Sequence, residues 1–102
     1  MSRIYNKLVR DKIPDIIKSK GEDCKFEVLN DEDYKDFLDK KLNEEVAEYQ
    51  YSKSLSELAD IIEVVYTIAK TRGFTPEQME ELRILKKESK GGFNKGILLI
   101  ES

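Results

Sequence analysis

Five carboxylates within seventeen consecutive positions occupy the middle of this sequence, and their spacing restricts how the chain can fold. They are Glu44, Glu45, Glu48, Glu57 and Asp60. Separations of three and four residues place side chains next to each other on one face of an α-helix. Like charges in that arrangement repel and slightly destabilise a helix. The pattern therefore predicts helical segments whose acidic faces need a cation.

Hydrophobic periodicity around this stretch predicts four helices. The expected helices span residues 12–20, 31–51, 57–72 and 76–89. Residues suited to N-capping precede them, namely Asp11, Asn30 or Asp31, Ser54 or Ser56, and Thr75. The third helix is apolar on more than one face, so it is expected to be the most buried. In the fourth, Met79, Leu82 and Leu85 are expected to face inward.

Two short segments outside these helices resemble β-strands. Cys24–Leu29 alternates apolar and polar residues, and Ile97–Ile100 is a short apolar run. Each is the simplest pairing partner for the other. The expected fold is therefore an all-α, four-helix domain with a small two-stranded β-ribbon.

Length and composition limit the size of the core. The chain has 102 residues, 38% of them charged, which predicts a single domain over residues 1–102 with a narrow hydrophobic core. A second copy of the chain is expected to complete that core. We therefore predict a homodimer or a homotetramer, with the site near the subunit interface.

Composition also excludes several classes of function. A formal charge of −3 argues against binding a nucleic-acid polymer through its phosphates. Cys24 is the single cysteine, so a reducing, cytoplasmic setting is expected. No apolar run approaches the ~18 residues that a membrane span needs. The sequence contains no histidine, which excludes histidine-dependent triads and histidine-ligated zinc sites.

Counting along the chain brings two pairs of acids together. The second and third helices are joined by a short turn, so they should pack as an antiparallel hairpin. At ~1.5 Å per residue, Glu45 and Glu48 before the turn reach heights similar to those of Glu57 and Asp60 after it. Four converging carboxylates form an oxygen-only site for Mg²⁺ or Mn²⁺ rather than zinc. Mg²⁺ usually completes its ligand shell with water and substrate phosphates.

The acidic pattern resembles the signature of a known enzyme superfamily. Glu44-Glu45-x-x-Glu48 followed by Glu57-x-x-Asp60 is similar to the motif of the all-α nucleotide pyrophosphohydrolases, which include MazG-like enzymes, dimeric dUTPases and phosphoribosyl-ATP pyrophosphohydrolase. Two flanking segments, Tyr5–Pro14 and Lys90–Phe93, resemble a branch of small phosphoribosyl-ATP pyrophosphohydrolase-like proteins. The resemblance covers nearly the whole chain.

The resemblance implies Mg²⁺-dependent attack of water on a nucleoside triphosphate at the α–β linkage, which releases the monophosphate and pyrophosphate, in a possible house-cleaning role. Carried over by position, Glu45, Glu48, Glu57 and Asp60 would bind the metal. Glu44 would be a further ligand or would orient the attacking water. The protein would contribute mostly positioning and electrostatic stabilisation.

One departure from the family pattern concerns the distance between the two acidic pairs. The gap from Glu48 to Glu57 is shorter than usual by about two helical turns. Removing about one turn from each arm of a hairpin leaves the same faces in contact, so the carboxylate cage is retained. The wall beyond the site becomes shorter, and base recognition would occur there. The substrate is therefore left open.

Other residues and other functions have competing interpretations. Lys7, Arg10 and Lys12 can bind substrate phosphates or form surface salt bridges, and Lys87 can bind phosphates or interact with a helix dipole. Glu44 alone can belong to a solvated face. A non-catalytic helical module that binds a nucleotide or a protein is the alternative to the hydrolase. A further alternative is the phosphoribosyl-ATP pyrophosphohydrolase of histidine biosynthesis.

Overall fold

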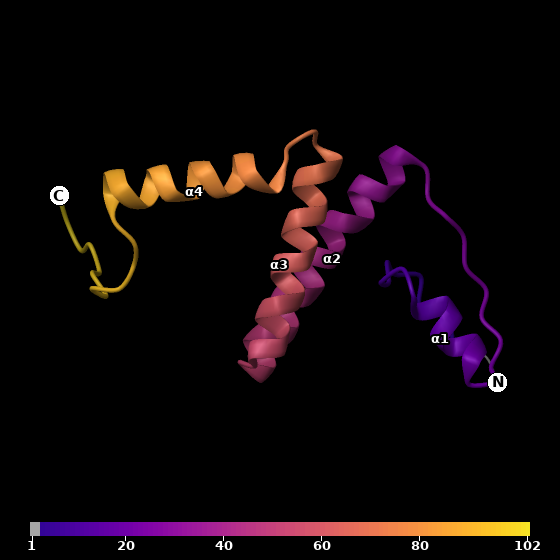
Figure 1. Ribbon diagram of the computed structural model, residues 1–102. Coiled ribbons are helices and arrows are strands. Elements are labelled where there is room, and N and C mark those ends of the chain that lie inside the picture. The colour runs from indigo at the N-terminus through magenta and orange to yellow at the C-terminus, as the bar shows by residue number, and fades with distance from the viewer. Residues whose placement is uncertain (1–2) are drawn as a thin grey trace. The chain divides into compact units, whose positions relative to one another are not determined.

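The computed structural model describes residues 3–102 and is helical, with four helices (Figure 1). They are α1 (Ile13–Ser19), α2 (Asp31–Ser52), α3 (Leu55–Thr71) and α4 (Pro76–Lys90). The all-α class is confirmed, and the helix boundaries lie within two residues of those expected. The chain divides into two compact units, one ending at Ile68 and the other comprising Ala69–Ser102. The prediction of a single domain stays a prediction.

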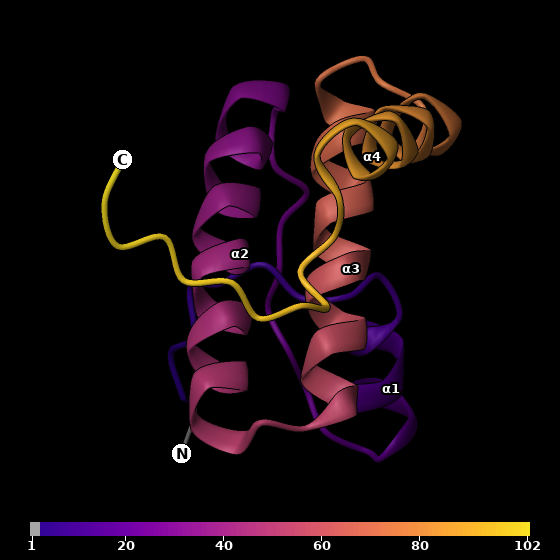
Figure 2. The same ribbon diagram turned by 90° about the vertical axis from the view of Figure 1, so that its left-hand side faces the viewer.

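Helices α2 and α3 form the expected antiparallel hairpin (Figure 2). The Asn30 side chain caps α2 by accepting a hydrogen bond from the Asp33 amide at 2.8 Å. Lys53 ends α2 in the left-handed conformation, with φ of 56°, and its amide donates to the Tyr49 carbonyl at 2.7 Å. The Ser54 hydroxyl then caps α3 by accepting from the Glu57 amide at 3.3 Å. The turn is therefore shorter than expected, with two residues between the helices.

Helix α1 is short and begins one residue later than expected. Its N-cap is Lys12, without a side-chain cap, rather than Asp11, and Pro14 lies in the first turn, where a missing amide hydrogen is tolerated. The left-handed Gly21, with φ of 77°, follows the helix. The Cys24 thiol lies 3.9 Å from the Pro14 carbonyl oxygen, so this half-buried cysteine packs beside the helix start.

The two segments predicted as strands are not strands, and the β-ribbon prediction is wrong for the described residues 3–102. Val28 is 91% exposed, and Ile97–Ile100 are 77–87% exposed. Isolated extended segments gain little stability in water because a strand needs a partner for its backbone hydrogen bonds. Alternation in the sequence indicates a strand only if such a partner is present.

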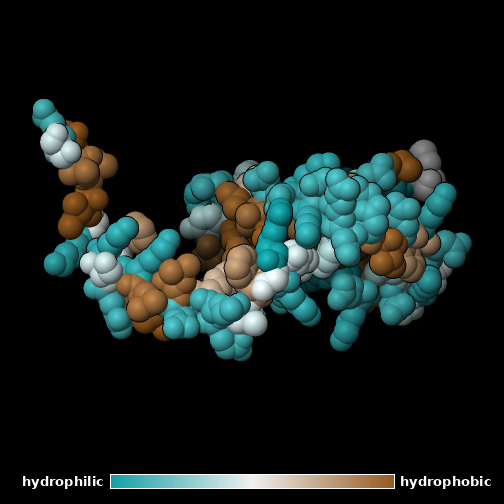
Figure 3. Space-filling model, turned by 90° about the horizontal axis from the view of Figure 1, so that it is seen from above, coloured by the Kyte–Doolittle hydropathy of each residue, from teal (hydrophilic) through white to brown (hydrophobic). Residues whose placement is uncertain are grey.

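The core of the described residues is small. The buried hydrophobic residues are Leu38, Val64 and Ala69. Leu38 lies on α2, and Val64 and Ala69 lie on α3, so these two helices contribute the three buried hydrophobic residues. Exposed apolar side chains are more numerous, and Figure 3 shows hydrophobic surface along the C-terminal part of the chain. A chain of this length with so few buried side chains has little hydrophobic stabilisation of its own.

The second unit contains α4 and the segment after it. The predicted capping box is present: the Thr75 hydroxyl accepts from the Gln78 amide at 3.1 Å, and the Gln78 side chain accepts from the Thr75 amide at 2.9 Å. Leu82 and Leu85 are 55% and 54% exposed, so the prediction that they face inward is wrong for this chain by itself. Among the described residues, no helix is long and apolar enough to cross a membrane.

Candidate metal centre

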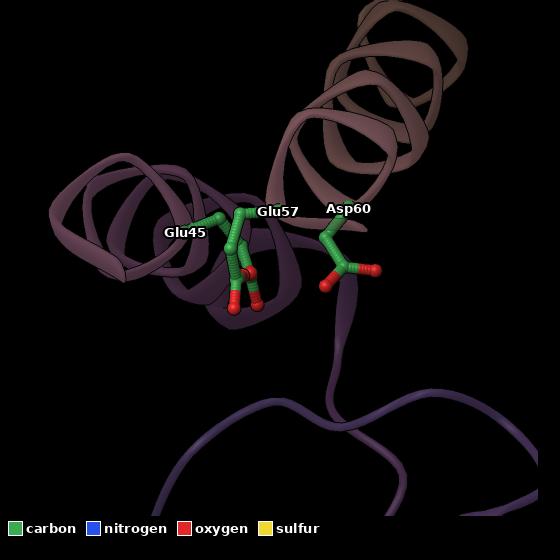
Figure 4. A group of neighbouring side chains, drawn as sticks. All are labelled: Glu45, Glu57 and Asp60. Carbon is green, nitrogen blue, oxygen red and sulfur yellow. The ribbon is translucent and has the colours of Figure 1, made fainter. Parts of the chain in front are cut away.

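Three of the predicted carboxylates converge between the arms of the hairpin (Figure 4). One carboxylate oxygen from each of Glu45, Glu57 and Asp60 lies within 4.8 Å of the others. Glu45 comes from α2, and the other two acids come from the first two turns of α3. Because only Lys53 and Ser54 separate the two helices, acids in the last turns of α2 and the first turns of α3 lie near each other.

Two oxygens of this cluster lack any hydrogen-bond partner. Glu45 is 6% exposed, and its Oε2 atom is buried without a partner, as is Oε2 of Glu57. A buried polar atom left unpaired costs about 1–3 kcal/mol, and more if it is charged. Oxygen-only ligands at this spacing suit a hard divalent cation such as Mg²⁺ or Mn²⁺. The residues present therefore fit such an ion.

The negative charges of the cluster act most strongly on Glu57. Burial raises the pKa of Glu57, and the Glu48 carboxylate beside it raises this pKa further. The charges of Glu48, Glu45 and Asp60 act in the same direction. A proton on Glu57 relieves part of this repulsion in the absence of a metal. A divalent cation would relieve the same repulsion and favour the ionised carboxylate.

Two cations of the chain already contact the cluster. Lys41 Nζ lies 3.2 Å from Glu45 Oε1 and 3.5 Å from Glu44 Oε2. On α3, Asp60 Oδ1 accepts from Arg10 Nη2 at 2.7 Å. The Lys41 side chain is 16% exposed and that of Arg10 is 58% exposed. The lysine therefore acts from the shielded side of the cluster, whereas the arginine is open to solvent.

The remaining predicted residues are more dispersed. Glu48 is exposed and contacts Glu57, but it lies outside the group of three. Glu44 pairs with Lys41, and 41% of its side chain is exposed. The Nζ atom of Lys7 lies 5.7 Å from the centre of the Tyr5 ring, and Lys12 is exposed at the start of α1. Lys87 belongs to the second unit.

Lys41 was not predicted from the sequence. Its signal was available, because a lysine three and four residues before two glutamates lies beside both on a helix. Such spacing is common on solvated helices, so it does not distinguish a site residue from a surface salt bridge. The low exposure of the Lys41 side chain distinguishes it from a surface salt bridge. Exposure depends on the fold and cannot be read from the local sequence.

Comparisons with known proteins leave the family open. No protein-family model matches the chain, and no solved structure matches it. A protein of Mycolicibacterium smegmatis described as uncharacterized is 49% identical over 41 residues, which are 40% of this chain. The chain spans about two-fifths of that relative, 42% of its length. This similarity carries no information about activity.

Proposed function

We propose that this protein is a Mg²⁺-dependent nucleotide pyrophosphohydrolase that cleaves a nucleoside triphosphate, or a related nucleotide, between its α- and β-phosphates. The observation that carries the proposal is the convergence of Glu45, Glu57 and Asp60, with two buried oxygens that have no partner. The resemblance of the acidic motif supports the reaction type. A site made only of carboxylates suits an ion that binds phosphates as its remaining ligands.

Each acidic residue has a role in this proposal. Glu45, Glu57 and Asp60 would hold the ion, and Glu48, in contact with Glu57, would be the fourth ligand. The bound ion would supply positive charge to the phosphates and lower the pKa of a water molecule. Glu44 would accept a hydrogen bond from the attacking water and so orient it. Its half-exposed side chain leaves that position open to solvent.

Arg10 would contact the substrate phosphates. Its guanidinium already lies at the cluster, 2.7 Å from Asp60 Oδ1, and more than half of its side chain is exposed. A phosphate bound beside Asp60 would therefore be within reach of the same group. Guanidinium groups bind phosphate oxygens through paired, charge-assisted hydrogen bonds.

A second copy of the chain would complete the molecule. Leu58, Ile62 and Tyr66 follow one another at four-residue spacing on α3, and they are 40%, 53% and 40% exposed. This spacing places the three side chains in one stripe along the helix. We propose that the stripe packs against the partner subunit in a homodimer or homotetramer, close to the acidic site on the same helix.

The test is pyrophosphate release from a panel of ribo- and deoxyribonucleoside triphosphates and phosphoribosyl-ATP, with Mg²⁺ and with EDTA. We expect release that requires the metal and that falls at least about a thousandfold in Asp60→Ala, because the loss of a charged ligand removes transition-state stabilisation. Glu63→Ala is the matched control, since Glu63 is an exposed acid one turn later on α3. It should retain normal activity.

Three other outcomes would change this proposal. Metal binding without release from any of these nucleotides would favour the non-catalytic binding module. Release from phosphoribosyl-ATP alone would identify the histidine-pathway enzyme. Equal activity with EDTA and with Mg²⁺ would contradict the proposed metal centre.

A further inference from the structure

We infer that Lys41 is a positioning residue of the metal centre: it holds one oxygen of Glu45 so that the other remains directed at the ion. The inference rests on the proposed metal site and deepens it. The acidic motif itself contains no lysine, so this role is separate from the ligands considered so far.

The first argument is that the two carboxylate oxygens of Glu45 have different surroundings. Oε1 lies 3.2 Å from Lys41 Nζ, whereas Oε2 is buried and has no hydrogen-bond partner. A carboxylate with one oxygen fixed by a cation cannot rotate freely about its last torsion. In Figure 4, the Glu45 carboxylate lies beside that of Glu57 and points in the same direction. The free oxygen is thus available to an ion shared by both acids.

The second argument is shielding. Only 16% of the Lys41 side chain and 8% of the Glu45 side chain are exposed. Exposed ion pairs contribute little because solvent screens them and both side chains stay mobile. A shielded pair is held in one geometry, and a lysine can donate up to three hydrogen bonds from one ammonium group. Lys41 uses this capacity to contact Glu44 as well, at 3.5 Å.

The third argument concerns the order of the two residues. On an isolated helix, a glutamate four residues before a lysine stabilises more than the reverse order. Lys41 precedes Glu45, so the pair has the less favourable order for helix stability. Its placement is better explained by the orientation of Glu45 than by the stability of α2.

The test compares the Mn²⁺ affinity of the full-length protein with that of three variants by calorimetric titration. Lys41→Met removes the ammonium group, Lys41→Arg retains a cationic donor, and Lys40→Met is the matched control. Lys40 is the exposed neighbour, with its Nζ 4.8 Å from the centre of the Phe37 ring. We expect about tenfold weaker binding in Lys41→Met, as is typical when the partner of a metal ligand is lost. Lys41→Arg should recover most of the affinity, and Lys40→Met should match the wild type.

Whether Lys41→Met weakens or strengthens Mn²⁺ binding distinguishes a positioning role from a purely electrostatic one. If Lys41 acted only as a positive charge near the ion, its removal would reduce repulsion and Lys41→Met would bind Mn²⁺ more tightly, which would overturn the inference. A lower melting temperature with unchanged affinity would show a merely structural role and would also overturn it. A double-mutant cycle with Glu45→Gln should show that Lys41→Met has no further effect once the ionised Glu45 is absent.

The same titration distinguishes the failure of the inference from the failure of the proposed function. If the wild type binds Mn²⁺ and Lys41→Met binds it equally well, the positioning role is wrong and the metal centre stands. If the wild type binds no Mn²⁺ at millimolar concentration, both the metal centre and the role of Lys41 are wrong.

Discussion

The side chain of Glu57 makes the folded protein sensitive to pH. Its pKa is raised, chiefly by burial and by Glu48, so the folded state holds a proton to higher pH than the unfolded chain does. Between the ordinary glutamate pKa, near 4.3, and the raised value, the folded state binds more protons than the unfolded state. The free energy of unfolding therefore falls as pH rises through this window. Above the raised pKa, the stabilising contribution of the Glu57 proton is lost completely.

Glu57→Gln should abolish this loss, because glutamine carries no charge at any pH. We expect the metal-free variant to be more stable than the wild type at pH 8 and to depend less on pH, measured by urea unfolding. Saturating Mg²⁺ should stabilise the wild type at pH 8 and have little effect on the variant. Glu63→Gln, on the exposed face of α3, serves as the control. A wild type whose stability rose steadily from pH 5 to 8 would contradict the raised pKa.

Arg10 allows the two interpretations of the N-terminal basic residues to be separated. Its pair with Asp60 is more than half exposed on the arginine side, so Arg10→Ala should lower the free energy of unfolding by at most about 1 kcal/mol. If Arg10 also contacts substrate phosphates, KM for the nucleotide should rise about tenfold in Arg10→Ala, because the variant loses one charge-assisted hydrogen bond to the substrate. Steady-state kinetics measures this, with Lys20→Ala, an exposed cation at the end of α1, as the control. An unchanged KM would leave Arg10 as a structural ion pair.

At the scale of elements, the turn of the hairpin contains a strained residue. Lys53 has φ of 56°, a left-handed backbone conformation that glycine adopts readily and that residues with a Cβ atom disfavour. Lys53→Gly should therefore stabilise the hairpin by about 0.5–1 kcal/mol, although it also removes the contact of Lys53 with the Gln50 side chain. Thermal unfolding measures the effect. Lys53→Val should destabilise the protein, and a glycine variant no more stable than the valine variant would contradict the argument.

The helices could be predicted from the sequence because their signals are local. Asn30, Ser54 and Thr75 cap helices through neighbours three residues away, and each was recognised as a possible cap. The strands could not be judged in this way, because pairing depends on a distant partner that local alternation does not reveal. The turn was overestimated because the left-handed conformation of Lys53 is unusual for lysine, so the sequence offered no signal for a two-residue connection.

The candidate site was predicted in part. Glu45, Glu57 and Asp60 follow from helical spacing and a short turn, and all three converge. The fourth acid, Glu48, contacts Glu57 but lies outside the group of three. The rise per residue predicts the position of a side chain along the helix axis, but it does not predict how each helix is rotated about that axis. Arg10 reaches Asp60 from fifty residues away, a contact that no local pattern could assign.

At the scale of the whole molecule, the small core bears on assembly. We expect light scattering coupled to gel filtration to give a mass of at least twice the 11.9 kDa of one chain, because association would bury the exposed apolar stripe of α3. Ile62→Asp should shift the mass to that of the monomer. Glu63→Asp, at the next position, should leave it unchanged. A wild type of 11.9 kDa would contradict the proposed dimer.

The short connection between α2 and α3 also bears on the order of folding events. Glu45 is only 12 and 15 positions from Glu57 and Asp60, so the acidic cluster closes a small loop. Contacts at such short separation form fast because little chain entropy is lost in closing them. The pair between Arg10 and Asp60 closes a loop of 50 positions, so we expect it to form later. We therefore expect the hairpin to form before the N-terminal segment docks, so that a divalent ion bound at the proposed site would favour the hairpin early in folding.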